Sequence, residues 1–198
     1  MTRRALLAIV PGLLLMSCGE APVSKAPEAP PEPVTGLHAL FQVYAQARNW
    51  APDIKVVRFS SRNVPELKAQ PGKAGAWQVL FASESLGQTR SYTFSVYDES
   101  ETLRQGIFSD PPGPLSSDIH SFVIGDASAD SDKAWEVARS HGEKYASEHP
   151  DMPISYLLEP DSEKGGPAWR VVWGLSTATS SFSVLVDAHT GEYVRSLH

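Results

Sequence analysis

Apolar residues repeat with helical spacing near the start of the sequence and with strand spacing after it. Over residues 36–50 the repeat gives a helix one apolar side, with Thr35 as its cap and Pro52 as its stop. Four strands are predicted next, at 54–60, 76–83, 90–97 and 103–108. Their period of two indicates an antiparallel sheet with one buried face. The apolar side of the helix consists of Leu37, Leu40, Phe41, Tyr44 and Ala47.

The same order of elements begins again after a proline-rich break at 111–114. A short strand at 119–124 precedes a helix that Ser131 or Asp132 caps and that runs to about residue 148. We expect His141, on the apolar side of this helix, to pack in the core. Strands follow at 154–158, 168–175, 181–186 and 192–197. The apolar side consists of Ala134, Val137, Ala138, His141 and Tyr145.

The two series of strands align with one another. Residues 76–81 read Ala-Trp-Gln-Val-Leu-Phe, and residues 168–173 read Ala-Trp-Arg-Val-Val-Trp. A repeated order of one helix and three or four strands indicates an internal duplication, although any small α+β unit shares that order. The predicted fold class is α+β, with two similar units that each pack one helix on an antiparallel sheet of three to four strands.

Four large aromatic side chains occupy equivalent positions in these strands. Trp77 and Phe81 are four residues apart, as are Trp169 and Trp173, so each pair points to one face of its sheet. If the helices cover that face, the four side chains belong to the core. If the helices cover the opposite face, they form an exposed aromatic platform that can bind a peptide or a partner protein.

The N-terminal residues have the pattern of a bacterial export signal. Arg3 and Arg4 precede an apolar run over 5–16, which as a helix would span only about 18 Å of a hydrocarbon layer roughly 30 Å thick. The run ends at Leu15-Met16-Ser17-Cys18, which resembles the lipobox of bacterial lipoproteins. The resemblance implies cleavage before Cys18, a diacylglycerol thioether on its sulfur and an acyl chain such as palmitate on its new amino group. A plain secretory signal with an incidental cysteine is the alternative.

The residues after Cys18 bear on the location of the protein. Gly19 stands where some lipoproteins carry the aspartate that retains them at the inner membrane, so the lipobox resemblance implies an outer-membrane anchor in a cell with two membranes, facing the periplasm or the surface. Residues 19–35 form a tether, because their prolines favour extended backbone; at about 3.1 Å per residue it reaches roughly 50 Å. A proline-rich binding motif is the alternative. The prolines are Pro22, Pro27, Pro30, Pro31 and Pro33.

Three stretches of the second unit resemble the PepSY domain. They are residues 130–138 (Asp-Ser-Asp-Lys-Ala-Trp-Glu-Val-Ala), 167–171 (Pro-Ala-Trp-Arg-Val) and 187–194 (Asp-Ala-His-Thr-Gly-Glu-Tyr-Val). Residues 36–110 match only in the order of elements, because the threonine-glycine pair of the closing hairpin is missing at 98–101. Members of the family occur in propeptides of secreted metallopeptidases and as exported or lipid-anchored envelope proteins. The resemblance implies inhibition or modulation of an envelope peptidase.

The closing hairpin of the second unit also has a physical explanation. Gly191 supplies the positive φ angle that a short loop needs, and the Asp187 carboxylate and Thr190 hydroxyl can accept hydrogen bonds from neighbouring amides. We therefore interpret Asp187, Thr190 and Gly191 as a structural turn. A calcium site at Asp187 is the alternative, with Glu192 as the only other carboxylate close in sequence.

These features divide the chain into five predicted segments. A lipoprotein signal peptide covers 1–17, and the lipidated cysteine with its proline-rich tether covers 18–35. A degenerate PepSY-like unit covers 36–110, a linker covers 111–130, and a PepSY-like unit covers 131–198.

Charge and composition exclude several classes of function. With 17 Lys and Arg against 23 Asp and Glu, the formal charge is −6 and no basic run exists, so nucleic acid is not expected as a partner. The single cysteine rules out an intramolecular disulfide and a Cys-based zinc site. The sequence has no G-x-S-x-G elbow, no H-E-x-x-H helix and no glycine-rich phosphate loop. We therefore predict no catalytic residues, no bound metal and no cofactor other than the lipid on Cys18.

The expected function is that of a membrane-anchored, non-catalytic protein-binding module. An envelope peptidase is the expected partner, bound through a sheet edge or strand loops. Two alternatives remain open: a structural or assembly factor of the cell envelope, and a carrier of a small apolar ligand held between sheet and helix.

Overall fold

The first half of the folded chain contains one helix and seven strands among the residues that the structure describes. The computed structural model describes residues 31–98, 103–163 and 165–198. We call residues 34–114 the N-half. Its elements are β1 (Val34–Thr35), α1 (Gly36–Ala47), β2 (Lys55–Arg62), β3 (Lys73–Ala74), β4 (Ala76–Ser83), β5 (Gln88–Ser95), β6 (Gly106–Ser109) and β7 (Gly113–Pro114).

The second half repeats the order of helix and strands. We call residues 124–198 the C-half. Its elements are a 3₁₀ turn η1 (Ile124–Asp126), the helices α2 (Ser131–His141) and α3 (Glu143–Glu148), and the strands β8 (Ile154–Pro160), β9 (Pro167–Trp173), β10 (Phe182–Asp187) and β11 (Tyr193–Leu197).

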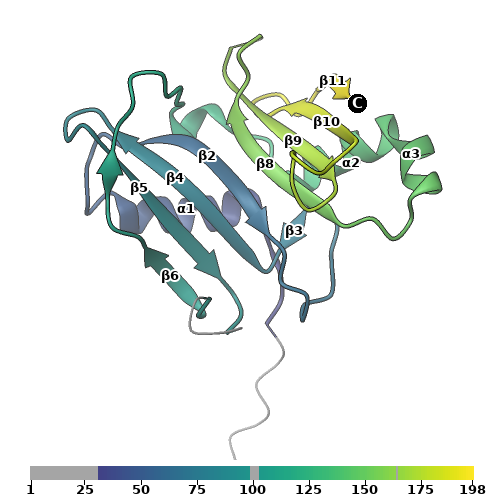
Figure 1. Cartoon of the computed structure of the whole chain (residues 1–198), viewed down its shortest axis with the longest axis horizontal. Helices are drawn as coiled ribbons and strands as arrows, with labels where there is room; N and C mark the ends of the chain where they lie inside the picture. The colour runs from purple at the N-terminus through teal and green to yellow at the C-terminus, as the bar shows by residue number, and fades with distance from the viewer. Residues whose placement is uncertain (1–30, 99–102, 164) are drawn as a thin grey trace, which may run out of the picture. The chain divides into compact units, whose positions relative to one another are not determined.

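Within the described residues, nine strands from the two halves join in one antiparallel sheet, and the helices pack on one of its faces; β1 and β3 form a separate two-stranded antiparallel sheet. The order along the sheet is β11-β10-β9-β8-β2-β4-β5-β6, with β7 paired to β5. In Figure 1, α1 lies behind β2, β4 and β5, and it packs against all three. The α+β class is confirmed and is consistent with a PepSY-like fold. The sequence did not predict that the two sheets join, which they do through the antiparallel pair β2–β8.

Two helix predictions needed correction. The first helix ends at Ala47 and not at residue 50, because the amide of Trp50 already bonds the carbonyl of Ala47 in a tighter turn. The second is interrupted at Gly142, which separates α2 from α3. A Cβ at Gly142 would lie 2.9 Å from Phe182 and from Trp173, so the close approach of the helix to the sheet requires glycine there.

Two side chains predicted on apolar helix sides are exposed. Phe41 is 50% exposed, because Ala39 and Val43 supply the buried side of α1 together with Leu40. His141 is exposed and stacks on Tyr193 of β11, with ring centroids 3.8 Å apart, so the expected core histidine was wrong. Both residues lie next to the buried stripe of their helix, where periodicity alone fixes the facing side poorly.

The strand predicted at 119–124 is reduced to one bridge. Phe122 and Val56 exchange two backbone hydrogen bonds of 2.9 Å, and η1 follows directly. The segment thereby extends the sheet beside β2 by one residue pair.

Equivalent tryptophans make equivalent contacts in the two halves. The indole N–H of Trp77 donates to the carbonyl of Val34 at 3.2 Å, two residues before α1 begins. The indole N–H of Trp169 donates to the carbonyl of Ala129 at 2.8 Å, two residues before α2 begins. The two rings meet edge to face with centroids 6.2 Å apart. The core therefore runs without interruption from one half into the other.

The surrounding rings repeat this correspondence. Phe59 of β2 contacts Trp169 at 6.2 Å, and Tyr156 of β8 contacts Trp77 at 6.1 Å. These crosswise contacts place an approximate two-fold axis between β2 and β8, because each strand offers its ring to the tryptophan of the other half. The pairs Phe59↔Leu158 and Ser60↔Leu157 hold the two strands together at this point.

The starts of the two helices also meet in the interior. The buried hydroxyl of Ser131 accepts from the amide of Gly36 at 2.7 Å and donates to the carbonyl of Gly72 at 2.5 Å. One carboxylate oxygen of Asp130 accepts from the amides of Ser131 and Leu37, at 2.6 and 2.8 Å. A single Asp-Ser pair thus satisfies amides at both helix N-termini, which otherwise lack partners.

Candidate functional site

The sheet opens where the two halves diverge. Beyond Ser60↔Leu157 the backbone pairing of β2 with β8 stops, and the amide of Tyr156 bonds the side-chain oxygen of Ser61 at 2.9 Å instead. A hydroxyl in place of a carbonyl directs β2 away from the beginning of β8. Within the described residues, the first residues of β8 therefore have no neighbouring strand on the edge that faces β2.

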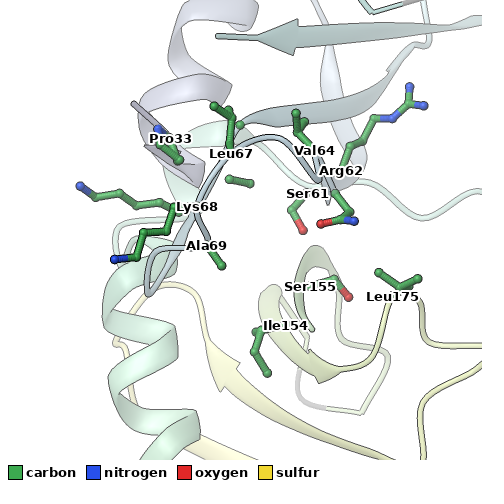
Figure 2. A pocket seen from close by; sticks show the side chains of 14 residues that line it. Pro33, Ser61, Arg62, Val64, Leu67, Lys68, Ala69, Ile154, Ser155 and Leu175 are labelled. Carbon is green, nitrogen blue, oxygen red and sulfur yellow. The ribbon is translucent and has the colours of Figure 1, made fainter. Parts of the chain in front are cut away.

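Three adjoining hollows surround the beginning of β8, and we call them together the junction cleft. The first measures about 70 Å³ and lies between Ile154 and the loop after β2; Figure 2 shows Ile154, Ser155 and Leu175 on one side and Ser61, Val64 and Arg62 on the other. The second, about 170 Å³, opens on the sheet face opposite the helices. The third, about 350 Å³, lies toward α2 and is lined by Trp135.

The backbone of Ile154 faces the cleft. The carbonyl of Pro153 accepts from the amide of Gly174 at 2.7 Å, so residue 153 directs its hydrogen-bonding groups toward the β9 side. Neighbouring residues of a strand direct these groups to opposite edges. The amide and carbonyl of Ile154 therefore point away from β9 and into the junction cleft.

The corresponding position of the N-half is filled. Val56 of β2 bonds the backbone of Phe122 through both its amide and its carbonyl. Because β4 occupies the other edge of β2, Phe122 lies on the edge that β2 shares with β8. About the approximate two-fold axis, the edge of β8 at Ile154 corresponds to this edge of β2. One of two matched strand positions is occupied and the other is open to the cleft.

Cations gather around the cleft although the chain is acidic. Arg62, Lys68 and Lys73 line the first hollow and Arg58 lines the second, and neither hollow has an acidic lining residue among the described part of the chain. None of the four forms an ion pair with another described residue. Asp151 lines the third hollow. The rim of the cleft therefore carries positive charge on a chain of formal charge −6.

The third hollow has an apolar lining that Tyr156 helps to hold in place. The half-buried side chains of Trp135, Met152 and Ile154 face it. The hydroxyl of buried Tyr156 accepts from the amide of Gly72 at 2.8 Å, which fixes the loop before β3. Burial raises the pKa of Tyr156 to about 12, so the hydroxyl stays neutral. The cleft thus joins an apolar side near α2 to a positively charged rim.

The four aromatic residues considered as a platform are in the core. Trp77, Phe81 and Trp169 are 0% exposed and Trp173 is 1% exposed, because the helices cover the face to which they point. They cannot contact a partner directly. Trp77 and Trp169 instead pack on the helix-covered face of the sheet, where their rings contact Phe59 of β2 and Tyr156 of β8.

The predicted turn residues lie at the β10–β11 hairpin, away from the cleft. The Asp187 carboxylate accepts from the amides of His189 and Thr190 at 2.8 and 2.9 Å, and the Thr190 hydroxyl accepts from the amide of Glu192 at 3.2 Å. Gly191 has φ of 75°. This geometry is that of a structural turn. Cys18, the predicted lipidation site, lies outside the described residues.

The residues of the cleft escaped sequence analysis. Ile154 was placed at the start of a strand, but nothing in its neighbourhood shows that one edge of that strand stays unpaired. The loop after β2 carried one usable signal, because Arg62, Lys68 and Lys73 fall within twelve residues that contain only one acid, Glu66.

Searches for two other kinds of site were negative within the described ranges. No group of three or more His, Cys, Asp or Glu side chains there has the geometry to hold a metal ion. Among the same residues, none of the helices has the length and apolar character needed to cross a membrane.

Comparison with known proteins shows the fold and no family. The sequence matches no family model and no curated protein. A solved structure from Clostridium difficile 630, described as a "putative lipoprotein", is similar with a TM-score of 0.52 and 10% sequence identity. The similarity covers 80% of this chain and 91% of that one. At this identity the likeness concerns the arrangement of helices and sheet.

Proposed function

We propose that this protein is an exported, lipid-anchored protein of the cell envelope that binds another protein at the junction cleft and performs no chemistry. Following the PepSY resemblance, the partner is an envelope peptidase that the domain inhibits or modulates. Cys18 carries the acyl chains, and residues 19–35 hold the domain away from an outer membrane in a cell that has two.

One observation carries the binding function. The strand edge at Ile154 faces a cleft with an apolar side and a positively charged rim. Exposed strand edges bind extended segments through backbone hydrogen bonds, while adjacent pockets and charges select the sequence. Trp77 packs against Tyr156 of β8, the strand that carries this edge, and supports it from the core, which favours a preformed surface for the partner.

The anchor is supported by the sequence and by the similar structure. Leu15-Met16-Ser17-Cys18 follows a charged start and a short apolar run. The protein of similar fold is itself described as a "putative lipoprotein". Two or three acyl chains make membrane release negligible, because each buried methylene contributes about 0.8 kcal/mol. Cys18→Ala should move the protein from the membrane fraction to the soluble fraction, and continued membrane association would contradict the anchor.

A photo-crosslinking experiment in cells tests the binding function. A photoreactive amino acid replaces Leu175, which is 62% exposed and lines two hollows of the cleft. The matched control replaces Leu86, which is 47% exposed and lies outside the residues lining the cleft. We expect a crosslinked peptidase from position 175 and none from position 86. Equal crosslinking from both positions would contradict binding at the cleft.

The partner then decides between inhibition and the alternatives. The captured peptidase should be slowed by the purified full chain in detergent micelles, and an unaffected peptidase would leave binding without inhibition. Crosslinking to envelope assembly proteins instead would favour the structural role.

A second function has its own observation. The hollow of about 350 Å³ beside Trp135 and Met152 has the size and the apolar lining of a small-ligand site. Native mass spectrometry of the full chain tests this ligand-binding function. A bound apolar molecule would add a defined mass to the chain, and the Trp135→Ala variant should lack that added mass.

A further inference from the structure

We infer that the junction cleft takes up an extended segment of the partner protein in which acidic and apolar residues alternate. The segment pairs antiparallel with β8 at Ile154. The inference rests on the proposed protein-binding function and adds the chemistry of what is bound.

The filled counterpart shows what kind of chain fits. Beside β2, the backbone of Phe122 both donates to and accepts from Val56 at 2.9 Å. The approximate two-fold axis relates that position to the edge of β8 at Ile154, whose amide and carbonyl face the cleft. An occupant therefore needs extended backbone with a free N–H and a free C=O at the bridging residue.

The protein's own tether does not meet this requirement. Phe122 precedes the first residue of α2 by nine positions, and the residue nine positions before Gly36 is Pro27. Proline has no amide hydrogen and cannot donate to the carbonyl of Ile154. Further prolines at 22, 30, 31 and 33 remove other donors. We therefore infer that the occupant comes from another molecule.

The lining of the cleft sets the side chains of the segment. Successive side chains of a strand point to opposite faces. On the helix side of the β8 edge lies the apolar hollow with Trp135 and Met152. At the edge and on the opposite side lie Arg62, Lys68 and Arg58. Alternating apolar and acidic residues place each kind against matching chemistry. The cations, which form no ion pair with another described residue, favour Asp and Glu.

A peptide selection tests the inference. A random dodecapeptide library is selected on the full chain held in detergent micelles, and the enriched peptides are synthesised. We expect Asp or Glu at every second position with apolar residues between, and hydrogen-exchange protection of the Ile154 amide by the bound peptide. Absence of enrichment, or enrichment without acidic residues, would overturn the inference.

Variants locate the binding. Ile154→Pro removes the amide hydrogen that the strand edge donates, and the double variant Arg62→Glu, Lys68→Glu reverses the charge of the rim. Each change should raise the Kd of the selected peptide about tenfold or more. Lys133→Glu, a charge reversal at an exposed position of α2 outside the cleft lining, should leave the Kd within about twofold. If Ile154→Pro fails to fold, the selected peptide is methylated instead, in one version at its odd-numbered amides and in another at its even-numbered amides. One of the two methylated peptides should then bind the unaltered protein about tenfold more weakly than the unmethylated peptide. Equal binding to all variants would contradict pairing at β8.

Three further outcomes distinguish the possible occupants of the cleft and separate this inference from the proposed function. If deletion of residues 19–30 exposes the Ile154 amide to exchange in the absence of peptide, the tether fills the cleft and the inference fails. If position 175 captures a partner in cells while the selected peptides are not acidic, the proposed function stands and the inference about chemistry fails. If acidic peptides bind but no partner is captured at 175, the proposed function in cells fails.

Discussion

The N-half and the C-half share an interior and differ at their edges. In both, an indole N–H bonds a carbonyl two residues before the helix, and a ring of the central strand crosses to the other tryptophan. At the edges, the position beside Val56 is filled by Phe122, whereas the matched position beside Ile154 faces the junction cleft. Interior positions have little freedom because a packed core tolerates few volumes, while edges can diverge. The proposed binding surface therefore lies where the two halves differ.

The outward faces of the two central strands differ in the same way. Ser60 and Leu157 oppose each other near the approximate two-fold axis, and both point away from the helices. Ser60 is half-buried beside the polar side chains of Arg58 and Gln78, whereas Leu157 is 4% exposed. The C-half thus has buried apolar residues on both faces of its sheet, and the N-half has a polar outward face.

Removal of either matched tryptophan should have the largest effect. Trp77→Ala and Trp169→Ala each remove a fully buried ring, and each should lower the free energy of unfolding by about 3–5 kcal/mol. The double variant should lose less than the sum, because the rings contact each other at 6.2 Å. Urea unfolding measures both quantities. A large loss from one tryptophan beside a negligible loss from the other would break the correspondence of the halves.

Loss of the shared helix cap should come next. Ser131→Ala leaves the buried amide of Gly36 and the carbonyl of Gly72 without their partner, which should cost about 1–3 kcal/mol of unfolding free energy. Ser140→Ala, at an exposed site on the same helix, is the control and should change stability by less than about 0.5 kcal/mol. Equal effects of the two variants would show that the hydroxyl does not link the halves.

Hydrogen exchange compares the matched edges directly. The amide of Val56 is bonded to Phe122, while the amide of Ile154 faces the cleft. We expect Ile154 to exchange roughly tenfold faster or more than Val56 in the unbound protein with residues 19–30 deleted. Similar rates would mean that the edge of β8 already has a partner within the folded domain.

Acid titration should show the smallest effect, and Asp53 of the N-half is the group that we expect to contribute to it. Hydrogen bonds from the amide of Ser85 and the hydroxyl of Ser83 lower the pKa of Asp53 from 3.8 to about 2. Because the folded chain holds this proton less tightly than the unfolded chain, the stabilisation is present above about pH 4 and is lost as the pH falls toward 2. Asp53→Asn should reduce the change in urea midpoint between pH 5 and pH 2. An unchanged difference would contradict the role of Asp53.

Several elements could be predicted because local patterns decided them. The strand at 76–83 matches β4 at both ends, since Trp77, Val79 and Phe81 place large apolar side chains at every second position. The turn chemistry at Asp187 depends on residues within five positions of one another, so it too could be derived from the sequence. Phe41 and His141 were misplaced because each borders the buried stripe of its helix, where a small rotation exposes the side chain.

The sequence alone determined the order of the main helices and strands, the two-residue alternation within the strands and the candidate anchor, because these depend on neighbours along the chain. Only the tertiary structure decided that β2 and β8 join two sheets into one and that Trp77 meets Trp169. The tertiary structure also decided that the edge of β8 at Ile154 faces the junction cleft. These features depend on residues about a hundred positions apart, and a pairing that ends after two residue pairs leaves no periodic signal in either strand.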